Sequence, residues 1–132
     1  MSQKNLETVR RMVDLANRGD VNGIVELMAP DVVCVPAAEQ PDSEPFRGRD
    51  AFAEYAREWL AAFDQYVIEV SEYLDLGDYV IVVGRVVARG WGSGAETAGH
   101  DAWLYRFRDG LVVEYRACGT KTEALQIAGR AA

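Results

Sequence analysis

The amino-acid sequence predicts one α+β domain in which helices cover one face of a mostly antiparallel sheet. Three observations support this class. The chain has 132 residues, which is the length of a single domain. Its first half carries apolar residues at helical spacing, and its second half contains successive strand-like segments separated by turn residues. Helices that are segregated in this way from a run of strands are typical of α+β domains. We therefore assign residues 1–132 to one domain.

The chain begins with two predicted helices. Apolar residues recur at three- and four-residue steps over residues 6–16, and Gly19 follows as a helix-ending residue. Asp20 is expected to cap a short second helix that reaches Met28. The sequence Ala-Pro-Asp at residues 29–31 should end that helix, because proline disfavours helical backbone in the residue before it.

A strand, a long loop and a third helix are expected next. Residues 32–35 are mostly β-branched and predict a strand. Residues 36–48 hold three of the four prolines, so we expect a loop that forms a rim or lid. Asp50 should cap the third helix. The apolar stripe of this helix is Phe52, Tyr55, Ala56, Trp59, Leu60 and Phe63.

The second half of the sequence predicts antiparallel strands and a closing helix. Asp109 and Gly110 form the dipeptide that favours a tight hairpin turn. Thr120 and Glu123 have the spacing of a capping box and should begin the last helix. The expected strands cover residues 66–74, 79–89, 97–107 and 111–118.

Composition restricts the classes of partner. The formal net charge of -7 disfavours binding to phosphate backbones and anionic membrane surfaces, so we expect neither nucleic acid nor membrane as a partner. A polar N-terminus and short apolar runs indicate a cytoplasmic protein, in which Cys34 and Cys118 would be reduced thiols. A disulfide between them remains an alternative. One histidine and two distant cysteines offer no metal-ligand cluster, and no cofactor is expected.

Several short phrases occur in a characteristic order along nearly the whole chain. Each phrase is a helix cap or a turn and is weak evidence for a protein family when taken alone. Their order and spacing together are more specific. The phrases cover residues 16–20, 28–31, 46–48, 90–94 and 107–110. In this order the chain resembles the nuclear-transport-factor-2-like superfamily, specifically its SnoaL-like and ketosteroid-isomerase-like branch. The resemblance implies a cone: a strongly curved sheet around three helices, with a pocket inside. It also implies a homodimer.

The resemblance places the residues of the ketosteroid-isomerase mechanism on side chains without acid–base chemistry. The position of the aspartate base falls on Val35, and that of the helix-one tyrosine falls on Met12. The position of the second aspartate falls on Trp103. Valine, methionine and tryptophan do not transfer protons, so this reaction is not expected.

The limonene-epoxide-hydrolase pattern is also incomplete. Its arginine matches Arg85, and the positions of its two aspartates fall on Val87 and Ala117. Both carboxylates are therefore missing, although a register error of one or two residues would change this assignment. Arg85 could then act as an electrostatic anchor for a carbonyl or carboxylate of the ligand. The alternative is that Arg85 is exposed to solvent or lies in a dimer interface.

SnoaL-type cyclases use an aspartate acid/base, often beside a histidine, and this sequence has His100 and Asp101. Neighbouring strand residues point to opposite faces, so only one of the two can face the pocket. Asp101 shares its parity with Trp103 and is expected to face inward, and a bulge would reverse this. Asp101 is therefore the candidate for proton transfer.

The sequence thus predicts a protein that binds a hydrophobic, cyclic small molecule. As an enzyme it would carry out cofactor-free isomerase- or cyclase-type chemistry with Asp101 and Arg85 as catalytic residues. The alternative is a non-catalytic ligand-binding or dimerisation module without turnover. The candidate pocket walls are Met12, Val35, Tyr55, Trp59, Val87, Trp103, Tyr115 and Ala117.

Overall fold

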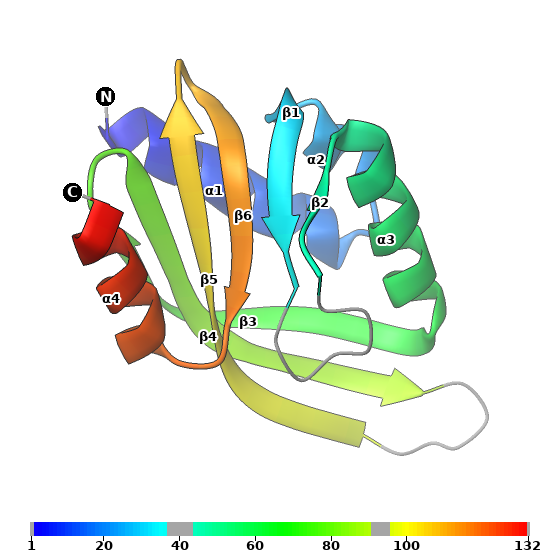
Figure 1. Cartoon of the computed structure of the whole chain (residues 1–132). Helices are drawn as coiled ribbons and strands as arrows, with labels where there is room; N and C mark the ends of the chain where they lie inside the picture. Colours follow the sequence, from blue (N-terminus) through cyan, green and yellow to red (C-terminus); the bar gives the residue numbers. More distant parts are fainter. Residues whose placement is uncertain (1, 37–43, 91–95, 132) are drawn as a thin grey trace.

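The computed structural model describes residues 2–36, 44–90 and 96–131, and it confirms the α+β class (Figure 1). Three helices and two strands precede a run of four further strands and a last helix. In chain order the elements are α1 (Ser2–Asn17), α2 (Val21–Val25), β1 (Met28–Val35), β2 (Phe46–Arg47), α3 (Arg49–Ala61), β3 (Phe63–Asp75), β4 (Tyr79–Gly90), β5 (Glu96–Arg108), β6 (Leu111–Cys118) and α4 (Lys121–Ala131).

One curved, open sheet contains all the strands, in the order β2-β1-β6-β5-β4-β3. Neighbouring strands are antiparallel except for β1 and β6, which run parallel. The long strands β3, β4 and β5 sweep around in a strong bend (Figure 1). At Gly84 the neighbouring strand approaches so closely that an added Cβ atom would lie 2.3 Å from the carbonyl oxygen of Glu69. The pairing of β3 with β4 shifts register between Val70 and Glu72, beside this glycine.

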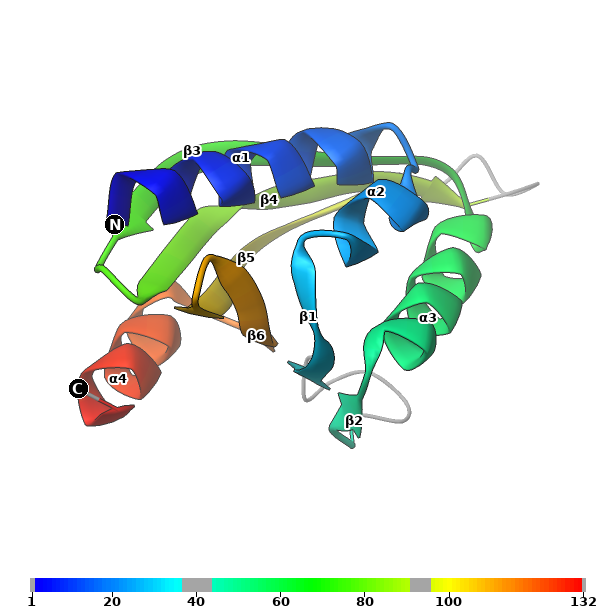
Figure 2. The ribbon, with the colours of Figure 1, turned by 90° about the horizontal axis from the view of Figure 1, so that it is seen from above.

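The inner face of the sheet holds the main core. The helix α1 lies along β3 and β4 on this face, and α3 stands near β1 and β2 (Figure 2). Val80 and Val82 of β4 are fully buried against this core. The interior cluster consists of Val9, Met12, Leu15, Ile24, Met28, Val32, Cys34, Phe52, Val80, Val82, Trp103, Tyr105, Phe107 and Val112.

The helix α4 covers the opposite, outer face of β4, β5 and β6. Ala124 and Ala128 of α4 pack there against Ile81 and Leu104, which are also fully or almost fully buried. The first half of β4 is therefore buried on both of its faces, which explains why residues 80–83 are all apolar.

The predicted caps at Asp20 and Thr120 and the predicted hairpin are confirmed. The backbone N–H of Gly23 donates to Oδ1 of Asp20 at 2.9 Å, and this bond caps α2. Thr120 accepts from the N–H of Glu123 at 3.1 Å at the start of α4. Asp109 and Gly110 both have positive φ, at 54° and 80°, as the tight turn between β5 and β6 requires.

Four boundaries differ from the sequence prediction. Met28 begins β1 instead of ending a helix, because its backbone pairs with Val112 of β6. Phe46 and Arg47, predicted in a loop, form β2 against β1. Gly48 precedes α3 as its N-cap at a φ of 101°, and Asp50 lies in the first turn. Phe63 begins β3 instead of extending the helix.

In the part of the chain that the structure describes, no helix is both long and apolar enough to cross a membrane. The described cysteines, Cys34 and Cys118, are free and buried. They belong to different clusters on opposite faces of the sheet, which fits the predicted thiols better than a disulfide.

Candidate functional site

Aromatic side chains from four strands and one helix gather where α3 meets the inner face of the sheet. The rings of Tyr105 and Tyr115 lie 5.3 Å apart, measured between centroids. Phe52 of α3 contacts Tyr115 edge-on at 6.0 Å. We call this set the aromatic end, and its members are Phe46, Phe52, Tyr55, Trp59, Phe63, Tyr66, Tyr105 and Tyr115.

The outer half of the aromatic end is held by ring contacts between α3, β2 and β3. Trp59 meets Phe63 at 5.4 Å and Tyr66 at 6.4 Å, both edge-on. Tyr55 packs on Phe46 of β2 at 5.1 Å. Such contacts fix the ring orientations before any ligand arrives, so the surface is preorganised.

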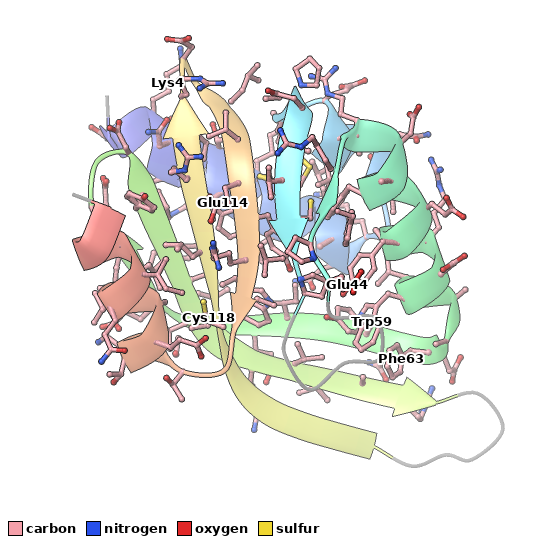
Figure 3. The ribbon with its side chains drawn as sticks, in the orientation of Figure 1. Lys4, Glu44, Trp59, Phe63, Glu114 and Cys118 are labelled. Carbon is pink, nitrogen blue, oxygen red and sulfur yellow. The ribbon has the colours of Figure 1, made fainter. Side chains whose placement is uncertain are left out.

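A groove of about 610 Å³ lies along this half of the aromatic end. This volume falls within the range of roughly 300–1,000 Å³ that small-molecule sites occupy. Glu44 and Trp59 lie at the same end of α3 as Phe63 (Figure 3). The residues that line the groove are Glu44, Pro45, Phe46, Ala51, Glu54, Tyr55, Glu58, Trp59 and Ala62.

One face of α3 supplies most of the groove wall. Residues Ala51, Glu54, Tyr55, Glu58 and Ala62 recur at helical steps of three and four, so their side chains line one side of the helix. The buried residues of α3 are Phe52, at the edge of this face, and Ala53. The helix thus packs one face into the core and presents the other to the groove.

The phenols deeper in the aromatic end are neutral at physiological pH. Burial raises the pKa of both Tyr105 and Tyr115, and neighbouring phenols add to both shifts. Burial also raises the pKa of the Cys34 thiol to about 12. A neutral phenol donates a hydrogen bond but does not act as a base, and a thiol with this pKa is a poor nucleophile. The described interior therefore offers hydrogen-bond donors and apolar contact.

Four of the eight predicted pocket walls pack with the interior cluster, and two more line the groove. Met12 and Trp103 are buried members of the interior cluster, with exposed fractions of 3% and 6%. Tyr115 and Ala117 are partly buried against the same cluster. Tyr55 and Trp59 line the groove beside it.

Three of the predicted site residues lie at strand positions whose side chains point to the outer face of the sheet, away from the interior cluster: Arg85, Val87 and Val35. Arg85 alternates with Val86, which packs on the interior cluster, so its side chain leaves the outer face. Its guanidinium pairs with Glu69 at 2.7 Å, and both side chains are about half exposed, at 50% and 51%. Val87 shares the outward parity of Arg85. Val35 alternates with Cys34, which belongs to the interior cluster.

The structure places Asp101 and His100 by their backbones only. Asp101 pairs with Gly84 in the ladder between β4 and β5, and His100 pairs with Arg85. Asp101 thus occupies a position of the same parity as Trp103, as the sequence predicts. The side chains of both residues lie outside the described part of the structure. Residues 91–94 of the phrase at 90–94 also lie outside it.

Most members of the site were not selected from the sequence as site residues, and five of them are examples. Phe46, Phe63 and Tyr66 belong to the aromatic end, and Glu54 and Glu58 line the groove. The helical spacing of Glu54, Tyr55 and Glu58 was a usable signal for the two glutamates. No sequence signal indicated that Phe46 would be paired into the sheet.

The described side chains contain no group of three or more histidine, cysteine, aspartate or glutamate residues that could hold a metal ion. The groove also lacks lysine and arginine among its lining residues, so it has no cationic group for the phosphates of a nucleotide cofactor.

Comparisons with known proteins agree with this architecture. A protein from a soil-derived mobile gene cassette superposes with a TM-score of 0.81 at 21% identity, over 94% of this chain and 95% of that one. A putative SnoaL-like polyketide cyclase from a Jannaschia species gives 0.78 at 24% identity, over 96% and 91%. A protein of unknown function from Burkholderia pseudomallei gives 0.78 at 20%, over 93% and 95%.

At these identities the solved structures show the shared fold alone. A comparison with curated protein sequences gives no significant match. The family model for the SnoaL-like domain matches residues 9–115, which is most of the chain. The chain therefore belongs to the SnoaL-like domain family, and it has the nuclear-transport-factor-2-like fold.

Proposed function

We propose that this protein binds an apolar, ring-containing small molecule in the groove beside α3. The observation that carries the proposal is the groove itself, with a volume of about 610 Å³ and walls formed by Phe46, Tyr55 and Trp59. Flat aromatic walls favour flat or cyclic ligands, because such ligands bury apolar area against them with little loss of conformational entropy. The name of the Jannaschia neighbour, a putative polyketide cyclase, is consistent with this ligand class.

Ligand binding is tested by thermal shift with steroids, aromatic polyketides and cyclic terpenoids. A compound that binds only the folded protein raises its unfolding temperature, because it removes folded protein from the unfolding equilibrium. The site is then located with Ala51→Trp, which fills the groove, and Trp59→Ala, which removes one wall. Leu125→Ala is the control, since Leu125 is an exposed apolar residue of α4 on the outer face.

We expect both groove variants to lose at least tenfold in affinity for any compound found, and Leu125→Ala to retain it. Unchanged affinity in Ala51→Trp and in Trp59→Ala, with both variants folded, would contradict the groove as the binding site. A panel without any thermal shift, repeated without effect by direct calorimetry, would leave the dimerisation module as the better account.

We further propose Asp101 as the residue that moves a proton if the bound ring is also converted. The supporting observation is its strand position, which pairs with Gly84 and has the same parity as Trp103 of the interior cluster. Asp101→Asn should then abolish turnover while leaving ligand affinity within about threefold. Binding without turnover in the unmodified protein would identify a non-catalytic module. Arg85 has no ligand contact in this proposal, because its guanidinium pairs with Glu69 on the outer face.

A further inference from the structure

The groove has an acidic rim in addition to its aromatic walls. Three of its lining residues are Glu44, Glu54 and Glu58, and none is lysine, arginine or histidine. Each glutamate carries a negative charge at neutral pH, so the groove bears three negative charges beside the rings of Tyr55 and Trp59. Any ligand that enters it meets a negative potential.

The cations of α3 do not neutralise this rim. Arg49 donates from Nε to the carbonyl oxygen of Met28 at 2.8 Å, and Arg57 donates to Oδ1 of Asn22. None of the salt bridges found among the described residues includes a glutamate of the rim. Within the described structure the three carboxylates are therefore left to solvent and to the groove.

The arrangement is unfavourable for the helix alone. Glu54 and Glu58 are four residues apart on one helical face, where like charges repel each other and destabilise the helix. The same two residues flank Tyr55 on the groove face. A cation between them would relieve the repulsion and also lie near ring faces, which attract cations through their quadrupole.

We infer that the groove selects ligands that carry a positively charged amine on an apolar ring, and that it disfavours carboxylates. This inference rests on the proposed function, because it concerns the ligand class of the same groove. Charge complementarity specifies the occupant: the rings bury the apolar ring system, and the three carboxylates attract the ammonium group. The aromatic walls alone would accept a neutral ring equally well.

Three probes with one ring system and different charge test the inference. They are naphthylmethylamine, naphthylmethanol and naphthoate, which are cationic, neutral and anionic at pH 7. Dissociation constants are measured by calorimetry at low and at physiological salt. The indole N–H signal of Trp59 in the NMR spectrum, assigned with Trp59→Phe, reports binding in the groove.

We expect naphthylmethylamine to bind roughly tenfold more tightly than naphthylmethanol, a difference of about 1.4 kcal/mol. Naphthoate should bind most weakly, and added salt should reduce the advantage of the amine. The double variant Glu54→Gln/Glu58→Gln should remove most of that advantage, because it should lower the affinity for the amine far more than the affinity for naphthylmethanol. The matched control Glu7→Gln/Glu26→Gln removes two exposed charges elsewhere and should retain it.

The outcomes separate the two proposals. Equal affinity of the amine and the alcohol at Trp59, or tighter binding of naphthoate, overturns the charge selection and leaves the groove as a binding site. An equal loss of amine affinity in the groove variant and in the control also overturns it, because the effect would then come from the net charge of the protein. Absence of any response at Trp59 to all three probes counts against the proposed function itself.

Discussion

The interior beneath α1 and the aromatic end beside α3 are built from different residues and have different surroundings. Beneath α1 the side chains are aliphatic, and Val9, Met28 and Val80 have no exposed surface. At the aromatic end the rings of Tyr55 and Trp59 are only partly buried and border a groove. Close packing of aliphatic side chains stabilises the fold. The incompletely covered rings instead leave apolar area available for the proposed ligand.

The largest expected effect tests the aliphatic interior. Met28→Ala removes a fully buried side chain and leaves a cavity, so the free energy of unfolding should fall by about 2–5 kcal/mol. Urea denaturation measures the loss. Ligand affinity of the folded protein should be unchanged, because Met28 does not line the groove. A loss below about 1 kcal/mol would mean that the interior repacks and that the two regions differ less than their burial indicates.

An intermediate effect is expected at the bend between the two regions. Gly84→Ala places a Cβ atom 2.3 Å from the carbonyl oxygen of Glu69, so the strands must move apart. We expect a destabilisation of about 1–3 kcal/mol, measured by thermal or urea unfolding.

The control for this variant is Gly129→Ala in α4, where an added Cβ atom meets nothing within 4 Å. This change should stabilise the protein by about 0.5–1 kcal/mol, because alanine favours helix more than glycine does. If Gly84→Ala stabilised the protein as Gly129→Ala does, the close approach of the strands at Gly84 would not be what the bend requires.

The smallest expected effect concerns alkaline pH and the Cys34 thiol, which lies where the two regions meet. Its pKa is about 12 in the folded protein, above the value of 9.0 for an exposed thiol. The unfolded state therefore loses this proton first, and stability present below about pH 9 declines as pH rises toward 12. The loss of stability at pH 10 is about 1.4 kcal/mol.

Unfolding of the wild type and of Cys34→Ala, measured between pH 7 and 10, isolates this contribution. The wild type should lose more stability over that interval than the variant, whatever the difference between them at pH 7. Parallel decline of the two proteins would show that the thiol has the same pKa in the folded and the unfolded state. Tyr105 and Tyr115 add a decline of the same sign in both proteins, because burial also raises their pKa.

The sequence predicts the fold well because its caps, turns and apolar periodicity are local signals. The N-cap at Asp20 and the turn at Asp109 are examples in which a few neighbouring residues determine the conformation. Boundaries set by distant pairing were missed. Phe46 becomes a strand residue only through Cys34, and Met28 only through Val112.

The face of each β4 residue was the hardest feature to predict. Residues 80–83 are all apolar, because α1 and the inner core cover one face of β4 while α4 covers the other. Alternation of polar and apolar residues, which normally identifies the faces of a strand, is absent in such a segment. The outward position of Arg85 follows from the ladder and not from the local pattern. On β5, by contrast, Trp103 lies inside as its parity predicts.

The parallel pairing of β1 with β6 has a consequence for the order of folding. Val33 pairs with Glu114, so the contact closes a loop of about 80 residues. Helices and hairpins form from neighbouring segments, whereas this contact must wait until the last strand has left the ribosome. Because β1 holds β2 in the sheet and β2 supplies Phe46, the groove wall is completed only after the C-terminal strand is in place. A nascent chain that stops before β6 would therefore have its N-terminal helices but no complete groove.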